Sequence, residues 1–251
     1  MKQIYRMIVV AGISVIIGTG CKPKEETNAL MFEAQGNFNE AQSQWGAALL
    51  KVTEGAKIPD VNLSKVFAAD VWKKEMRKNV DWIYGPRVKL QNDFFNAVQG
   101  IQRCSTKVNI KDNTLDIISV KPITIEQFRG EWFRNFFGRN VMVDSSHGAL
   151  ADNAFSRNCS VINITSLRNY TYNIALVNKA TGRRTDLELF PESSLNFLVA
   201  PGDYLIVCRS KVQFDSGTMW YSRYDIIPVT IPQTSSLLTC EVRTKVDREK
   251  K

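Results

Sequence analysis

The sequence predicts an α+β fold in which an N-terminal α-helical hairpin region is followed by an antiparallel β-sandwich. Between residues 29 and 103, apolar residues recur every three or four positions, which is the period of helices that bury one face. After Cys104 the period becomes two, and turn residues separate the short runs, as in the strands of a sandwich. A hydrophobic content of 44% with 23% charged residues is typical of a globular chain.

The first 20 residues have the composition of an export signal. Lys2 and Arg6 precede an uncharged run over residues 7–17, and residues 18–20 are small, as a signal peptidase requires before its cut. The run is about half the roughly 20 apolar residues that a membrane-spanning helix needs. We therefore expect residues 1–20 to be a cleaved signal peptide.

The end of this segment, "IIGTGC", resembles the signal of bacterial lipoproteins, in which a small residue precedes an obligatory cysteine. The resemblance implies that Cys21 receives a diacylglycerol, becomes the new N-terminus and carries acyl chains such as palmitate. It also implies retention at the outer membrane, facing the periplasm or the cell surface, because Lys22 stands where aspartate marks inner-membrane proteins. Residues 21–28 then read as a solvated, lipid-anchored tether. An ordinary signal peptide followed by an unmodified cysteine is the alternative.

Residues 29–52 have the composition of a helical hairpin that is interrupted at Gly36 and Asn37. This segment resembles half of a tetratricopeptide unit, and the residues that carry the resemblance are Gly36, Phe38, Glu40, Ala41, Trp45, Ala48 and Leu49. No second copy follows at a fixed period, whereas stacked repeats usually need about three units. We therefore expect a single tetratricopeptide-like hairpin that other helices complete.

Two further helices are expected within the helical domain, which we place at residues 29–103. Residues 64–84 put an apolar stripe on one face, and Gly85 with Pro86 ends the helix. Residues 87–99 form the second helix, which Gly100 ends. We expect the aromatic residues of both stripes to lie in the core.

The β-sandwich is placed at residues 104–246, followed by a disordered tail at residues 247–251. Alternating apolar residues indicate strands over residues 172–176, 187–189, 195–199 and 204–208, and a hairpin turns at Ser216 and Gly217. The segment "LFPESSLNFLVAPGDYLIVC" resembles the last strands of the immunoglobulin-like or prealbumin-like modules of bacterial surface proteins. That resemblance implies an architecture and no chemistry.

One helix is expected inside the β region. In "PITIEQFRGEWFRNFFG", Thr124 and Gln127 have the spacing of a capping box, and aromatic residues follow at helical intervals. We expect this amphipathic helix to lie across the sheet and seal it. An aromatic face exposed to a membrane or a partner is the alternative.

Four cysteines follow Cys21 in the sequence: Cys104, Cys159, Cys208 and Cys240. In an oxidising compartment they are candidates for up to two disulfides, with three pairings open. None has the spacing of a zinc site. We expect no metal and no cofactor.

The sequence offers few residues for chemistry. A hydrolase would depend on the single histidine, His147, which lies in a stretch typical of a loop, and no nucleophile elbow is present, so we expect no enzyme. The strand "TMWYSRYD" supplies the candidate ligand-binding residues Tyr221 and Arg223 on one face, with Trp220 and Tyr224 on the other face in the core.

Together these observations predict a cell-envelope lipoprotein that acts as an accessory or adaptor by binding another envelope protein. The alternative is a glycan-binding or peptidoglycan-binding lipoprotein that uses exposed aromatic residues of the sandwich. The formal net charge of +8 is not accompanied by a nucleic-acid recognition motif, and an exported protein is separated from nucleic acid, so we expect no such partner.

Overall fold

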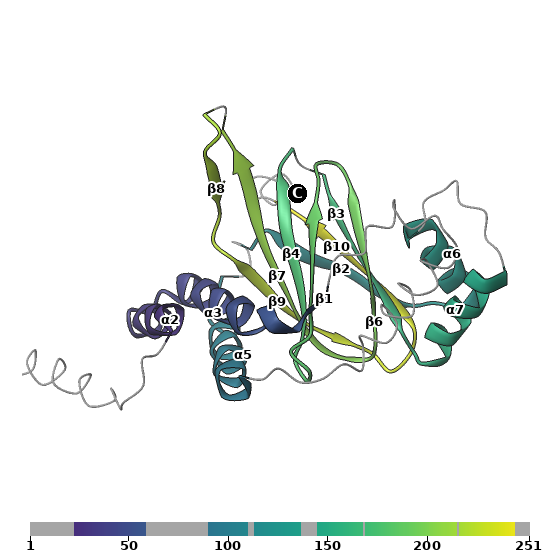
Figure 1. Cartoon of the computed structure of the whole chain (residues 1–251), viewed down its shortest axis with the longest axis horizontal. Coiled ribbons are helices and arrows are strands. Elements are labelled where there is room, and N and C mark those ends of the chain that lie inside the picture. Colours follow the sequence, from purple (N-terminus) through teal and green to yellow (C-terminus); the bar gives the residue numbers. More distant parts are fainter. Residues whose placement is uncertain are drawn as a thin grey trace, which may run out of the picture.

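The structure is a computed structural model that describes residues 23–58, 90–109, 113–136, 145–167, 169–214 and 216–243. Side chains are described within these ranges except at residues 132–136, 145–147, 149–150 and 213. Several expectations fall outside the described residues: the signal peptide, Cys21, the helix over residues 64–84 and the tail at 247–251. Helices followed by two β-sheets confirm the α+β class (Figure 1).

The expected N-terminal hairpin is formed by α2 (Lys24–Ala34) and α3 (Phe38–Val52). Gly36 lies between them at φ +75°, a conformation that glycine adopts without a steric penalty. The Asn37 side chain accepts a hydrogen bond from the backbone N–H of Glu40 and so caps α3. The two residues that break the helical pattern in the sequence therefore make the turn.

The expectation of a solvated tether up to residue 28 is wrong from Lys24 onward, because α2 begins there. Glu25 and Glu26 occupy its first turn, where carboxylates interact favourably with the helix dipole. The Glu25 carboxylate also pairs with Lys51 of α3 at 3.2 Å, and Ala29 is fully buried. Residues 24–28, which we expected to belong to the tether, therefore form the start of the first helix of the hairpin.

The third described helix, α5 (Gln91–Ser105), continues past Gly100, where we expected it to end. A Cβ atom on Gly100 would lie 2.6 Å from Nε1 of Trp45 and closer still to Cδ2 and Cε2 of that ring. The glycine therefore permits close packing of α5 on α3 and does not stop the helix. The expected domain boundary near Cys104 falls in its last turn.

Six strands form the first sheet, in the order β1-β5-β4-β7-β8, with β9 also paired to β7. Their bounds are β1 (Lys57–Ile58), β4 (Thr171–Asn178), β5 (Arg184–Leu189), β7 (Gly202–Gln213), β8 (Met219–Tyr221) and β9 (Asp225–Ile231). A short 3₁₀ helix, η2 (Glu54–Ala56), leads from α3 into β1. The second sheet has the order β2-β10-β3-β6, with β2 (Leu115–Pro122), β3 (Ser160–Ser166), β6 (Ser194–Val199) and β10 (Ser236–Val242).

The strands that alternation predicted are all present as β4, β5, β6 and β7, and the β7–β8 hairpin turns at Ser216 and Gly217 as expected. Most strand pairs are antiparallel, as the sequence predicted, and two pairs are parallel. β10 pairs with β3 in parallel, and the two-residue β1 pairs with β5 in parallel. Side-chain alternation reports which face a residue takes and carries no information on the direction of the neighbouring strand.

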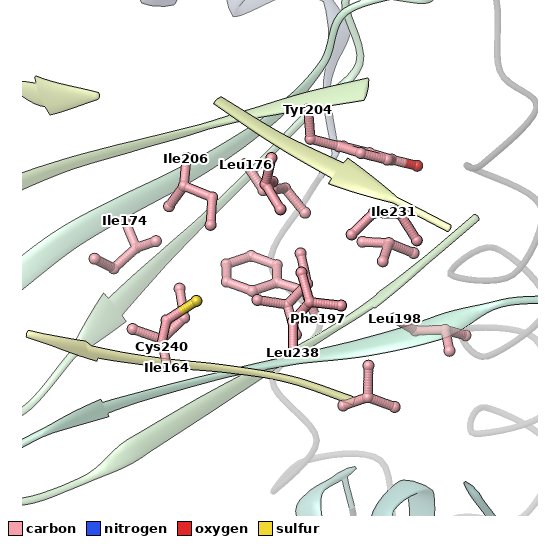
Figure 2. Close-up of a cluster of buried hydrophobic side chains, with 14 of the residues drawn as sticks. Ile164, Ile174, Leu176, Phe197, Leu198, Tyr204, Ile206, Ile231, Leu238 and Cys240 are labelled. Atoms are coloured by element: carbon pink, nitrogen blue, oxygen red, sulfur yellow. The ribbon is translucent and has the colours of Figure 1, made fainter. Parts of the chain in front are cut away.

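The main core lies between the two sheets. Figure 2 shows Ile164 and Cys240 of the second sheet opposite Ile174 and Ile206 of the first sheet, with Phe197 between them. These side chains are 0 to 3% exposed. Inward and outward residues therefore alternate as in other sandwiches.

A second apolar cluster joins the helices to the outer face of the first sheet, the face turned away from the second sheet. Trp45 and Leu49 of α3 and Phe94 and Ile101 of α5 pack there. The sheet residues that they cover are Ala175, Val177, Leu205, Val207 and Ile226. Figure 1 shows α2, α3 and α5 on this side and two other helices at the opposite end.

Those two helices are α6 (Ile125–Phe136) and α7 (Ser145–Ser156). The expected capping box at the start of α6 is confirmed: Thr124 N–H donates to Gln127 Oε1 at 2.9 Å, and Gln127 N–H donates to Thr124 Oγ1 at 3.3 Å. Phe128 is fully buried in the main core, so α6 packs on the second sheet as predicted. The side chains of Trp132, Phe133 and Phe136, with all of Phe137, lie outside the described residues.

Within the described part of the chain, none of the helices combines the length and the apolar character needed to cross a membrane.

Candidate aromatic hollow and arginine clamp

The β7–β8 hairpin extends beyond the region where the two sheets face each other (Figure 1). On the inner face of β7, Tyr204, Ile206 and Cys208 belong to the main core. The next two inward positions, Ser210 and Val212, instead line an open hollow. Along β7 the sandwich core thus ends at Cys208, and no described residue of the second sheet covers the inner face of the hairpin.

The hollow has a volume of about 490 Å³ and is lined by Tyr170, Ser210, Val212, Phe214 and Trp220. Its three aromatic side chains are 46% (Tyr170), 54% (Phe214) and 51% (Trp220) exposed. Trp220 pairs with Val212 across the β7–β8 ladder, which fixes it on this face. The lining is therefore mostly apolar although it is open to solvent.

The expectation that Trp220 lies in the core is wrong, since half of its surface is exposed. The alternation that predicted its face is correct, because Trp220 and Val212 point inward. The second sheet does not reach this far along β7, so within the described part of the chain it does not cover this inward face. Alternation predicts which face of its own sheet a residue occupies, but it does not predict how far the opposing sheet extends.

On the outer face of the same hairpin, the guanidinium group of Arg209 lies between two tyrosine rings. Its Cζ atom is 4.2 Å from the ring centroid of Tyr221 and 4.5 Å from that of Tyr224. Both distances are within the range of cation–π attraction. We call this arrangement of Arg209, Tyr221 and Tyr224 the arginine clamp.

A bulge between β8 and β9 brings the two tyrosines to one face. Tyr221 pairs with Lys211 and Asp225 pairs with Cys208, so residues 222–224 oppose only residues 209 and 210. The extra residue shifts the alternation by one position. Strict alternation predicted Tyr221 and Tyr224 on opposite faces, and that prediction is wrong because of the bulge.

Hydrogen bonds hold the bulge in place. Ser222 N–H donates to Ser210 O at 3.1 Å, and Ser210 N–H donates to Ser222 Oγ at 3.0 Å. Tyr224 N–H donates to Ser43 Oγ of α3 at 2.8 Å. The helical hairpin therefore positions one wall of the clamp.

Tyr224 is half-buried beside several charged groups. Burial raises the pKa of its hydroxyl group, and the positive charges of Arg209 and Arg184 partly oppose that effect. The Tyr224 hydroxyl group is therefore neutral at physiological pH and can donate or accept a hydrogen bond.

Arg223, the second expected ligand-binding residue, interacts with carboxylates of its own chain. Its Nε atom lies 3.3 Å from Asp225 Oδ1, and Nη1 lies 4.0 Å from Glu40 Oε1 of α3. Asp225 is buried and also accepts hydrogen bonds from Thr114 N–H at 3.0 Å and Thr114 Oγ1 at 2.8 Å. Arg223 thus links α3 to the sheet, and Arg209 is the arginine better placed to meet a ligand.

The expected disulfides are replaced by free thiols at Cys104, Cys159, Cys208 and Cys240, all of them buried. Cys104 belongs to the helical cluster, whereas the other three lie in the main core. Burial raises the pKa of the Cys104 and Cys159 thiols to about 11 and of the Cys240 thiol to about 12. Protonated, buried thiols of this kind pack as small apolar side chains and are poor nucleophiles.

The stretch around His147 is helical, whereas the sequence indicated a loop. His147 lies near the start of α7, and its side chain is outside the described residues. No group of three or more histidine, cysteine, aspartate or glutamate side chains suitable for a metal ion occurs in the part of the chain that the structure describes.

Comparison of the chain with protein families, with characterised proteins and with solved structures found no match. The β7–β8 hairpin and its two faces are therefore the features from which a function is inferred.

Proposed function

We propose that the protein is a cell-envelope lipoprotein, anchored through lipid on Cys21, that acts as a non-enzymatic accessory or adaptor by binding another envelope protein. The observation that carries the binding proposal is the aromatic hollow on the inner face of the β7–β8 hairpin. The anchor is supported by the N-terminal sequence alone.

The hollow has the chemistry of an interface centre. Tyr170, Phe214 and Trp220 expose large apolar areas side by side, and covering them would release water from all three rings. Aromatic residues, tryptophan and tyrosine above all, dominate the energetics of protein interfaces when a partner side chain desolvates them. An aliphatic or aromatic side chain of a partner protein fits such a lining.

A glycan is the second candidate, because Trp220 and Tyr170 could stack on a sugar ring. A sugar also needs hydrogen bonds for its hydroxyl groups, and among the described lining residues only Ser210 supplies an aliphatic hydroxyl group. The mostly apolar lining therefore favours a protein partner over a glycan.

The anchor is tested on the native protein by mass spectrometry of its N-terminus. We expect a mature chain that begins at Cys21 and carries acyl chains, and we expect Cys21→Ser to move the protein from the membrane fraction to the soluble fraction. A native chain that retains Met1, or whose N-terminal residue carries no acyl chain, would disprove the lipoprotein proposal.

The partner is sought in intact cells with a photoreactive aromatic amino acid in place of Phe214, which is exposed in the lining of the hollow. We expect a specific envelope protein to be cross-linked. The affinity of the purified pair is expected to fall about 30-fold or more with Trp220→Ala, because truncation of a central aromatic residue at an interface costs about 2 kcal/mol or more. Titration calorimetry measures this change.

Phe190→Ala is the matched control, since Phe190 is 57% exposed and lies outside the hollow. It should leave the affinity unchanged. A partner that binds Trp220→Ala as tightly as the original protein would contradict the proposal. Retention on purified glycan strands that Trp220→Ala abolishes, with no protein cross-linked, would replace it by the glycan alternative.

A further inference from the structure

Arg209 differs from the cations around it because it has no acidic partner among the described residues. Lys211 pairs with Glu188 at 2.8 Å, and Arg184 pairs with Asp186 at 2.5 Å. Arg223 meets Asp225, as described above. The contacts of the Arg209 guanidinium are instead the faces of Tyr221 and Tyr224.

The two rings pack against this guanidinium group, and its N–H donors make no hydrogen bond to the described residues. One of these donors, the Nε–H, is buried and has no hydrogen-bond acceptor. A buried donor without an acceptor costs free energy, but its burial also keeps an incoming ligand away from the Nε–H. The two terminal Nη groups are not among the buried atoms and make no hydrogen bond to the described residues, so they are the donors that an acceptor approaching edge-on would meet.

A planar anion satisfies this geometry best. The two oxygen atoms of a carboxylate can accept parallel hydrogen bonds from one edge of a guanidinium group, which combines direction with charge. The tyrosine rings shield part of the guanidinium group from water. The chain's excess of basic residues remains after Lys2 and Arg6 leave with the proposed signal peptide, and it favours an anionic ligand.

The clamp is held in position before any ligand binds. Arg209 lies in β7 with β4 paired on one side, and Ser43 accepts a hydrogen bond from the backbone of Tyr224. Tyr221 is fixed by its pairing with Lys211 in the β7–β8 ladder. Little conformational entropy remains to be lost, and that lowers the cost of binding.

We propose that Arg209, clamped between Tyr221 and Tyr224, binds the carboxylate group of a peptide ligand, from an acidic side chain or from a chain terminus. The proposal goes beyond the adaptor function, because the clamp lies on the outer face of the hairpin and the aromatic hollow on the inner face. An experiment can therefore disprove carboxylate binding at the clamp without disproving partner binding at the hollow, and the reverse also holds.

The test follows the Arg209 Nε–H resonance by NMR in the full-length protein at constant ionic strength. The probes are N-acetylaspartic acid amide for a side-chain carboxylate, N-acetylglycine for a terminal carboxylate, N-acetylasparagine amide as the uncharged control, and inorganic phosphate. We expect a saturable shift with at least one carboxylate probe and none with the asparagine probe. The probe that binds more tightly identifies the source of the carboxylate.

Two variants assign the shift to the clamp. Arg209→Gln should abolish binding of the carboxylate probe, as followed on the amide resonances of residues 209–211 and 221–224. Tyr221→Leu keeps the arginine and uncovers one face, and it should weaken binding about two- to fivefold. Arg243→Gln is the matched control, because Arg243 pairs with Glu241 at 2.6 Å and lies outside the clamp.

The proposal is overturned by an unsaturated response to both carboxylate probes, by phosphate binding at least as tightly as either of them, or by equal binding to Arg209→Gln. Arg209→Gln could also unfold the protein, and in that case Tyr221→Leu decides: unchanged carboxylate affinity in a folded Tyr221→Leu variant contradicts the clamp. Neither outcome depends on the partner of the hollow.

Discussion

Replacing Phe128 with alanine is expected to lower the free energy of unfolding by about 3 to 5 kcal/mol, the usual cost of deleting a buried phenylalanine side chain. Phe128 is fully buried in the main core, and its ring meets the Phe155 ring of α7 edge-on at 5.5 Å. Since a domain is stable by only about 5 to 15 kcal/mol, this is a large fraction of the total. Denaturant unfolding measures the change through the transition midpoint.

Phe95→Ala is the control, because Phe95 is 48% exposed on α5 and does not belong to either apolar cluster. It should cost about 0.5 kcal/mol or less, as is usual for a surface substitution. Equal losses in the two variants would show that α6 does not seal the second sheet. The comparison thus tests the placement of the helix that the capping box predicted.

Much of the fold could be predicted from periodicity and turn residues. The α2–α3 hairpin, the start of α6 and the alternation in β4 to β7 follow from local patterns that each segment carries by itself. The strands β2, β3 and β10 were not identified. In β10 the buried residues Leu238, Cys240 and Val242 alternate with Thr239 and Glu241, so the signal was present, whereas β2 and β3 lack a clean alternation. In β3, for example, Val161 and Ile162 are both buried, one under α6 and one in the sandwich.

The features that sequence reasoning missed depend on contacts between distant segments. Gly100 has the local appearance of a helix stop, and only Trp45 of another helix shows why it is a glycine. The arginine clamp required the bulge at residues 222–224, which shifts Tyr224 to the face of Arg209. Arg209 follows the apolar end of β7, and no signal in its own neighbourhood indicates that two tyrosine rings pack against it.

The close approach of α3 and α5 leads to the second large effect, a loss of about 1 to 3 kcal/mol for Gly100→Ala. A methyl group there would overlap the Trp45 ring, and overpacking of a tight core typically costs this much. The ring cannot easily move aside, because its Nε1–H donates to Glu33 Oε1 at 2.5 Å and Arg103 lies 5.7 Å from its centroid. Thermal unfolding monitored by tryptophan fluorescence measures the loss.

The direction of this effect is what makes it informative, since alanine normally stabilises a helix relative to glycine by about 0.5 to 1 kcal/mol. Gly130 lies within α6, and a Cβ atom there would meet nothing within 4 Å. Gly130→Ala should therefore raise stability while Gly100→Ala lowers it, although the substitution is the same. If Gly100→Ala were also stabilising, α5 would have to lie farther from Trp45, and the helical cluster on the outer face of the first sheet would be packed differently.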